Sequence, residues 1–177
     1  KERVVSSRQQ LLRIDYESAH GVSDESQAMV LKQVSKLLPK ADAVIVQDYA
    51  KGLLSPQFNR EVLQLAEREG KPALVDPNDK SQLEDYRGAW LLTPNRKEAE
   101  RMLGQTIGDR QEVISAGREI LSRTQAKHAV ITLGGDGMAV FSSDPSEYRI
   151  IPTYAQEVFD VSGAGDTVIS VLALAFA

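Results

Sequence analysis

The chain lacks cysteine altogether, and it has only two histidines among 177 residues. The absence of cysteine excludes disulfides and thiol catalysis, and it fits a reducing compartment such as the cytoplasm. His20 and His128 are far apart in sequence, and neither has a second histidine nearby at metal-ligand spacing. His128 opens an apolar stretch, which favours a residue at a strand edge over a metal ligand. Neither histidine has a context that suits a Ser-His-Asp triad.

Long hydrophobic runs and strong charge of one sign are also missing. The apolar run 168–177 has ten residues, whereas a bilayer span needs about 20. Asp166 and glycines precede it, which favours a buried helix, although a run that continued beyond residue 177 is the alternative. The net charge of −4 argues against nucleic-acid binding. The charged N-terminus shows no signal-peptide pattern, so we expect a cytoplasmic protein without a membrane segment.

Short apolar segments alternate with amphipathic ones along most of the chain. Strands are expected at 43–46, 72–75, 89–92 and 129–132, and a hairpin at 138–142 and 148–151. Helices are expected from a cap at Asp24 to Pro39, from Ser55-Pro56 to Gly70, and at 96–103, 109–123 and after 165. Residues 1–17 read as a hairpin or two edge strands. Strands that are apolar on both faces predict a single α/β domain with a parallel sheet covered on both sides.

Polar residues and glycines follow these apolar strands where each strand ends. They are Asp48, Asp76, Asn95 with Glu98, and Thr132 with Gly134, Gly135 and Gly137. One such acid is unremarkable, because aspartate often caps the next helix. Open α/β sheets, however, bind their ligands at the carboxyl ends of the strands. Four consecutive polar strand ends therefore predict a phosphate and metal site at one edge of the sheet.

The segment 160–167, Asp-Val-Ser-Gly-Ala-Gly-Asp-Thr, is the strongest single motif. Gly163, Ala164 and Gly165 have little or no side chain, so their amide groups can approach an anion at a helix N-terminus. Asp166 in the first turn would then lie beside that anion, where it could take a proton from an attacking hydroxyl. The alternative is that Asp166 is only an acid favoured by the helix dipole.

Other nucleotide-binding signatures are absent from the sequence. No Gly-x4-Gly-Lys-Ser/Thr loop is present, and no Gly-x-Gly-x-x-Gly follows a strand. The His-Arg-Asp and Asp-Phe-Gly motifs of protein kinases are missing too.

The segment 160–173 resembles the C-terminal signature of the ribokinase-like sugar kinases, also called the phosphofructokinase B family. Val171 departs from the small residue that this pattern prefers, which concerns helix packing and not chemistry. Residues 93–98, Thr-Pro-Asn-Arg-Lys-Glu, resemble the family's Asn-x-x-Glu motif, and 132–137 resemble its nucleotide loop. The resemblance covers nearly the whole chain in the right order. It implies a three-layer α/β/α fold with a mainly parallel sheet and an N-terminal β segment that belongs to a lid.

The resemblance also implies roles for individual residues. Asp166 would be the catalytic base, and Gly163, Ala164 and Gly165 would stabilise the transferring phosphoryl group of ATP. Asn95 and Glu98 would position Mg²⁺ through water, and the nucleotide pocket would be lined by Thr132, Gly134, Gly135 and Gly137. Lys51 would face the phosphates, with a solvated loop lysine as an equal alternative. Asp160 and Ser162 correspond to positions that in some relatives bind a monovalent cation such as K⁺.

Four longer stretches, 7–17, 48–52, 86–95 and 155–166, resemble the kinase domain of bacterial heptose-7-phosphate kinases. Those enzymes phosphorylate the anomeric hydroxyl of D-glycero-β-D-manno-heptose 7-phosphate on the route to ADP-heptose and lipopolysaccharide, and many are fused to an adenylyltransferase. The family's Gly-Gly sugar-binding segment and its adenine-closing C-terminus are not found here. We therefore expect a domain truncated at both ends, with 1–17 in the lid and 18–177 in its central and C-terminal part.

Three functions remain open on the sequence. The first is a heptose-7-phosphate kinase that takes a sugar phosphate and ATP, with a homodimer through the lid as an implied assembly. The second is a kinase of the same family for another sugar or a nucleoside. The third is a non-catalytic nucleotide-binding module, against which the presence of both Asp166 and Glu98 argues.

Overall fold

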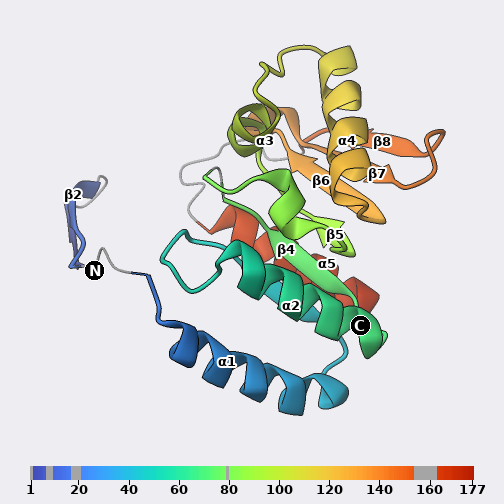
Figure 1. Ribbon diagram of the computed structural model, residues 1–177. Coiled ribbons are helices and arrows are strands. Elements are labelled where there is room, and N and C mark those ends of the chain that lie inside the picture. The colour runs from blue at the N-terminus through green and yellow to red at the C-terminus, as the bar shows by residue number, and fades with distance from the viewer. Residues whose placement is uncertain (1, 7–9, 17–20, 79, 154–162) are drawn as a thin grey trace.

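The computed structural model describes residues 2–6, 10–16, 21–78, 80–153 and 163–177. Its first two strands, β1 (Glu2–Val5) and β2 (Gln10–Ile14), pair antiparallel. They form a ribbon that projects away from the rest of the chain (Figure 1). Apolar residues on this ribbon are exposed, among them Val5 and Leu11. Of the two alternatives for residues 1–17, a hairpin or two edge strands, the structure has the antiparallel hairpin.

A six-stranded sheet forms the centre of the molecule, in the order β3-β4-β5-β6-β7-β8. Strands β3 to β6 are parallel, and β7 and β8 are antiparallel additions at the edge. The strands are β3 (Val44–Gln47), β4 (Ala73–Asp76), β5 (Leu91–Leu92), β6 (His128–Thr132), β7 (Met138–Ser142) and β8 (Tyr148–Ile151). The expected parallel sheet and C-terminal hairpin are thus confirmed. The strand expected at 89–92 is two residues long.

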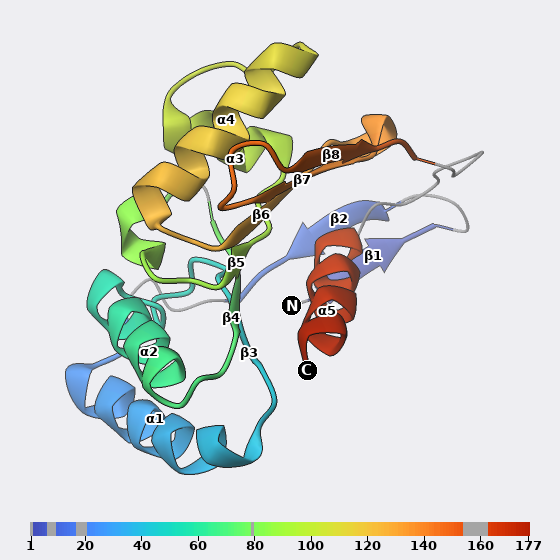
Figure 2. The ribbon, with the colours of Figure 1, turned by 90° about the vertical axis from the view of Figure 1, so that its right-hand side faces the viewer.

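Helices cover both faces of the sheet, as expected for a three-layer α/β/α fold. Figure 2 shows α1 to α4 on one face and α5 on the other. Their bounds are α1 (Asp24–Leu37), α2 (Pro56–Arg68), α3 (Arg96–Leu103), α4 (Arg110–Thr124) and α5 (Ala164–Phe176), with short 3₁₀ turns at Leu38–Lys40, Leu83–Tyr86 and Gly134–Asp136. None of the helices in the described ranges is long and apolar enough to cross a membrane.

Local capping explains where most helices start. Ser55 Oγ accepts a hydrogen bond from the Phe58 amide, and Pro56 is the first helical residue of α2. For α1 the expectation was wrong by one residue, because Ser23 and not Asp24 is the cap: Ser23 Oγ accepts from the Ser26 amide. Asp24 instead contributes negative charge to the first turn, where the helix dipole favours it.

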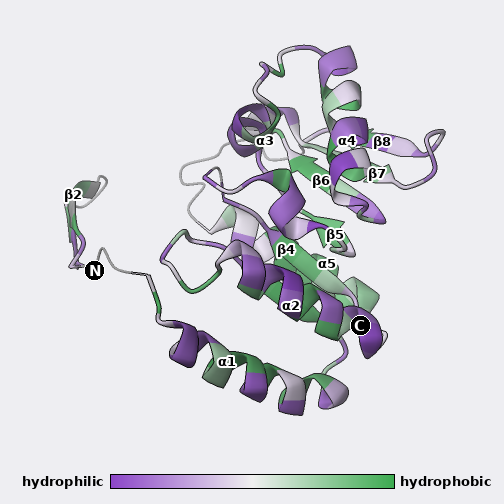
Figure 3. Ribbon diagram, in the orientation of Figure 1, coloured by the Kyte–Doolittle hydropathy of each residue, from purple (hydrophilic) through white to green (hydrophobic). Residues whose placement is uncertain are grey.

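Two apolar layers hold the helices to the sheet. The larger layer lies under α2 to α4. The smaller one is formed by Ile169 and Ala173 of α5, which pack on Leu74, Leu91 and Val130 of the sheet. Full burial of an isoleucine side chain stabilises a fold by about 1.5–3 kcal/mol. Figure 3 shows the strands and α5 as mainly hydrophobic and the outer sides of α2 and α4 as hydrophilic. The smaller layer fixes α5, and with it Asp166, on the sheet, where α5 contacts β3 and β4.

Candidate active site at the strand ends

The N-terminus of α5 lies at the carboxyl ends of β3 and β4. Gly163 precedes the helix in the left-handed conformation, with φ of 79°, and supplies no side chain to cap the first amides. Gly163, Ala164 and Gly165 are all exposed. Within the described residues no side chain caps these amides, and free amide groups at the positive end of the helix dipole suit an anion such as phosphate. The anion hole expected at these three residues stays a prediction.

Asp166 lies in the first turn of α5, and its carboxylate is exposed beside these amides. The hydroxyl of Tyr49, from the loop after β3, donates a hydrogen bond of 3.0 Å to Asp166 Oδ1. The Asp166 side chain is thus held by a residue 117 positions away in sequence. Sequence reasoning missed Tyr49, because an isolated tyrosine next to a strand-end aspartate carries no recognisable signal.

Asp76, the last residue of β4, brings a second carboxylate to the site. Gln47 Nε2 and Thr93 Oγ1 donate hydrogen bonds to it, the latter at 3.3 Å. A Cβ atom added at Gly165 would lie 3.5 Å from Asp76 Oδ2. Burial, together with the negative charge of Asp166, raises the pKa of Asp76 above its usual range. The sequence placed Asp76 among the polar strand ends but assigned it no role.

Asn95 and Glu98 form a capping box at the start of α3. Asn95 Oδ1 accepts from the Glu98 amide at 3.0 Å, and Glu98 Oε2 accepts from the Asn95 amide at 2.8 Å. Burial raises the pKa of Glu98, and the charge of Asp76 raises it further. The sequence signal for this cap was available, since Asn-x-x-Glu before an apolar stretch is itself a capping pattern.

Asp76 and Glu98 fit the weak protein coordination that Mg²⁺ prefers. No group of three or more metal-ligating side chains gathers within the described ranges, so the protein there offers no closed metal cage. Mg²⁺ is usually held by one or two carboxylates, with waters and substrate phosphates as its other ligands. Burial raises the pKa of both acids; the charge of Asp166 adds to the rise at Asp76, and the charge of Asp76 adds to the rise at Glu98. Partly buried carboxylates of this kind are suited to a nearby cation.

The loop after β6 lies next to the start of α3. Thr132 forms a parallel bridge to Asn95, and its amide donates to the Pro94 carbonyl at 3.0 Å. The Arg96 guanidinium pairs with Asp136 at 2.6 Å, which ties the loop to α3. Gly137 has φ of 97°, and a Cβ there would overlap the Ile151 carbonyl oxygen. Gly134 and Gly135 have open space at the Cβ position, so Gly137 is required by packing and the other two are accessible.

Four remaining sequence candidates have different outcomes. Asp48 is buried and faces the interior, where Tyr86 and the Ala50 amide donate to its carboxylate. Lys51 is exposed in the same loop. Asp160 and Ser162, the expected monovalent-cation ligands, lie outside the described residues.

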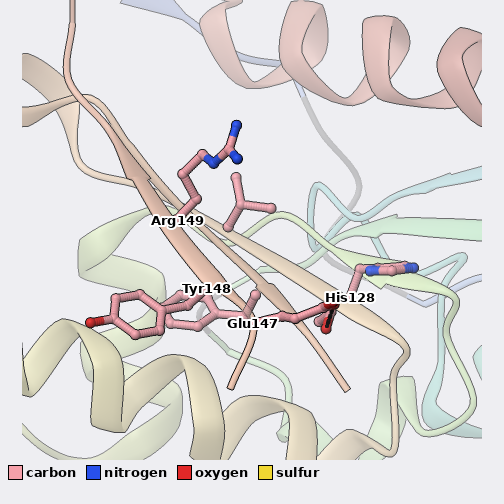
Figure 4. A pocket seen from close by; sticks show the side chains of 7 residues that line it. His128, Glu147, Tyr148 and Arg149 are labelled. Atoms are coloured by element: carbon pink, nitrogen blue, oxygen red, sulfur yellow. Dashed lines mark hydrogen bonds between the residues drawn. The ribbon is translucent and has the colours of Figure 1, made fainter. Parts of the chain in front are cut away.

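A pocket of about 330 Å³ is found at another place, on the β6–β8 hairpin. It is lined by His128, Val140, Phe141, Ser142, Glu147, Tyr148 and Arg149. His128 is the first residue of β6, at the end opposite Thr132, so this pocket lies away from the polar strand ends. Figure 4 shows the Tyr148 and Arg149 side chains pointing to opposite sides of their strand. Tyr148 and Arg149 therefore do not converge on one ligand position. The His128 ring packs against Trp90 and Phe176, whose rings also contact each other, and His128 is the first residue of β6.

Sequence comparison finds close relatives over the full length of this chain. The chain is 41% identical over 177 residues to "Bifunctional protein HldE" of Desulfatibacillum aliphaticivorans, covering all of this chain and 36% of that protein. It is 42% identical over 173 residues to the protein of the same name from Wolinella succinogenes, again covering 36% of the relative. The chain therefore spans about a third of the length of these relatives.

Solved structures share its fold at lower sequence identity. Phosphofructokinase-2 from Escherichia coli in complex with potassium superposes with a TM-score of 0.78 at 19% identity, over 94% of this chain and 53% of that one. Ribokinase from Arabidopsis thaliana, complexed with ribose and ATP, gives a TM-score of 0.67 at 20% identity, over 88% and 47%. The pfkB family carbohydrate kinase model matches residues 5–177. The chain therefore belongs to the PfkB family of carbohydrate kinases, which are phosphotransferases with an alcohol group as acceptor.

Proposed function

We propose that this chain carries the phosphoryl-transfer site of an ATP-dependent sugar kinase whose base is Asp166. The observation that carries the proposal is the pairing of an exposed carboxylate, Asp166, with the exposed glycine-rich start of the same helix. A carboxylate and a bound phosphate repel each other, so a carboxylate next to a phosphate site is best explained by a function in the reaction. In phosphoryl transfer such a carboxylate accepts the proton of the attacking hydroxyl.

In this proposal each residue of the site has its own role in phosphoryl transfer. Asp166 accepts the proton of the sugar hydroxyl, while the amides of Ala164 and Gly165 donate to the transferring phosphoryl group. Thr132 and the glycines at 134 and 135 would approach the nucleotide, and the exposed Lys51 would neutralise charge on its phosphates. Asp76 and Glu98 would hold Mg²⁺, which when bound neutralises charge that develops on the phosphate oxygens.

The acceptor that we propose is the anomeric hydroxyl of D-glycero-β-D-manno-heptose 7-phosphate. Support comes from the names of the relatives, which are 41% and 42% identical and both called bifunctional protein HldE. Further support comes from the four sequence stretches that resemble heptose-7-phosphate kinases. The product would then serve ADP-heptose and lipopolysaccharide synthesis in the cytoplasm.

Two further features belong to the same proposal. A monovalent cation such as K⁺ is an expected cofactor, supported by a potassium complex of the similarly folded phosphofructokinase-2. The β1–β2 ribbon is proposed to be part of the lid over the sugar and to mediate a homodimer. Its exposed Val4, Val5, Leu11 and Leu12 support that role, because such residues are stabilised when a partner covers them.

The test is an acceptor panel on the full-length protein. Heptose 7-phosphate, ribose, fructose 6-phosphate and adenosine are each supplied with MgATP, and formation of ADP and sugar phosphate is measured. The Asp166→Asn variant serves as a control for contaminating kinases. Turnover that is highest with heptose 7-phosphate supports the substrate, preference for another acceptor rejects it, and no MgATP turnover with any acceptor argues against catalysis. Replacement of KCl by tetramethylammonium chloride tests the monovalent cation.

A further inference from the structure

The loop that follows β3 is anchored from the protein interior. Asp48 is 7% exposed and Tyr86 is fully buried, and the Tyr86 hydroxyl donates to Asp48 Oδ2 at 2.8 Å. The other carboxylate oxygen, Oδ1, accepts from the Ala50 amide at 2.9 Å. Both oxygens of one buried side chain are therefore used to fix the backbone on each side of Tyr49.

The conformation of this loop is unusual for its sequence. Ala50 has φ of 53°, in the left-handed region that residues with a Cβ seldom adopt. Its hydrogen bond to Asp48 compensates for that cost, and the Gly52 carbonyl accepts from the Val22 amide at 3.2 Å farther along the loop. Backbone held this way commonly serves to place a side chain for function.

The side chain placed here is the ring of Tyr49, whose hydroxyl donates to Asp166 Oδ1 at 3.0 Å. Partial desolvation, the hydrogen bond to Asp166 and the charge of Asp76 all raise the pKa of Tyr49. The phenol therefore stays protonated at neutral pH and acts as the donor. Tyr49 is 61% exposed, so it contributes little to the core. A tyrosine kept for packing alone would be expected to bury its ring.

We propose that Tyr49 is a positioning residue for the catalytic base: it holds one oxygen of Asp166 and leaves the other for the acceptor hydroxyl. This inference rests on the proposed function of Asp166. A carboxylate with two rotatable side-chain bonds at an exposed helix start would otherwise sample several orientations. Fixing it lowers the cost of bringing base and hydroxyl into line.

The first test is Tyr49→Phe in the full-length protein, which removes one hydroxyl and keeps the ring. We expect kcat to fall about three- to tenfold, the usual net worth of one hydrogen bond, with the KM values for ATP and sugar unchanged. The unfolding midpoint should also stay the same. Tyr148→Phe is the matched control, since Tyr148 is likewise exposed but lies on β8 and stacks on Phe141. That variant should leave kcat unchanged.

A double-mutant cycle then separates positioning of Asp166 from any independent action of Tyr49. If Tyr49 acts through Asp166, Tyr49→Phe should not lower the residual turnover of Asp166→Asn any further. An equal fold-loss in both backgrounds, or an unchanged or raised kcat in Tyr49→Phe alone, overturns the proposal. Wild-type turnover in Asp166→Asn overturns the proposed function itself. Loss in Asp166→Asn without loss in Tyr49→Phe overturns only the role of Tyr49.

Discussion

Glu98 Oε2 accepts a hydrogen bond of 2.8 Å from the backbone amide of Asn95, while Asn95 Oδ1 accepts one of 3.0 Å from the amide of Glu98. The pair that the family resemblance assigns to magnesium is therefore also the cap of α3. One glutamate serves the stability of the helix through one oxygen and supplies negative charge to the site. Substitutions that separate these two contributions are available, because glutamine also completes a capping box.

Glu98→Gln should keep the cap and lose the charge. We expect a free energy of unfolding within about 0.5 kcal/mol of wild type, together with turnover lowered about 10–100-fold at saturating ATP. Glu98→Ala should lose similar turnover and, in addition, about 0.5–2 kcal/mol of stability through the broken cap. Urea unfolding and turnover across a magnesium titration measure both. Unchanged turnover in Glu98→Gln at every magnesium concentration would remove Glu98 from the site.

Asp76→Asn should stabilise the protein at neutral pH in the absence of magnesium and nucleotide. Burial raises the pKa of Asp76 above 3.8, so the folded state holds its proton more tightly than the unfolded chain does. Stability is therefore lost as pH rises from about 3.8 through that raised pKa. The side-chain amide of asparagine cannot ionise. The Gln47 side-chain amide can rotate so that it either donates a hydrogen bond to this asparagine or accepts one from it.

The measurement for Asp76 is urea unfolding of wild type and variant at pH 7 and near pH 4. The advantage of Asp76→Asn should be largest at pH 7 and should shrink toward the acid end. Lower stability of the variant at pH 7 would show that the charge of Asp76 is compensated in the folded state. The variant should also bind magnesium-nucleotide more weakly, because it loses one of two proposed metal carboxylates.

Most of the fold could be predicted from the sequence, because its signals are local. Alternation of apolar segments gave the parallel sheet, and Ser55 with Pro56 gave the start of α2. The two-residue β5 was overestimated, since Ala89 and Trp90 are apolar but only Leu91 and Leu92 pair as a strand. The Trp90 backbone still hydrogen-bonds to both neighbouring strands, through the Ala73 carbonyl and the His128 amide, so the expected strand differs from β5 only at its start.

The site was predictable in part, for a related reason. Asp166 and the glycines before it form one contiguous motif, so the sequence identified them. Tyr49 and Asp76 join Asp166 only through the packing of α5 on β3 and β4, over separations that no local pattern encodes. For Asp48 the local pattern misled. Its place at a strand end predicted a residue of the ligand site, but the hydroxyl of Tyr86, 38 residues later, binds its carboxylate in the protein interior.

Gly117 of α4 should not tolerate alanine. A Cβ there would overlap the ring of Phe141, which is fully buried in the larger apolar layer. Overpacking costs about 1–3 kcal/mol, and the better helix propensity of alanine offsets at most about 1 kcal/mol of it. We expect Gly117→Ala to lower the unfolding midpoint.

Gly135→Ala is the matched control for Gly117. Apart from its chain neighbours, no described residue has an atom within 4 Å of a Cβ at Gly135, and the Gly135 backbone is not left-handed. Stability should stay within about 0.5 kcal/mol of wild type. Because Gly135 lies in the proposed nucleotide loop, a raised KM for ATP in this otherwise stable variant would support that role. Equal stability of Gly117→Ala and wild type would contradict the packing at α4.

Asp166→Asn is the most direct test of the proposed chemistry. The attacking sugar hydroxyl is a weak nucleophile at neutral pH, and a positioned carboxylate typically contributes ~10²–10⁴ in rate. Asparagine has nearly the same shape but cannot accept the proton, so turnover should fall by roughly that factor. The substitution also removes a negative charge beside the proposed phosphate site. Affinity for ATP should therefore stay the same or increase.

Lowered turnover with unchanged or increased ATP affinity in Asp166→Asn would distinguish a catalytic base from an aspartate that only stabilises the helix. A helix-start aspartate favoured only by the dipole contributes about 0.3–1 kcal/mol of stability, so its loss would leave turnover intact. Steady-state turnover and ATP binding by calorimetry, both on the full-length protein, distinguish the cases. Turnover above about a tenth of wild type, far more than loss of a general base leaves, would assign the proton transfer to another group. A fall in turnover with equally weakened ATP binding would mean that Asp166 supports the nucleotide site instead.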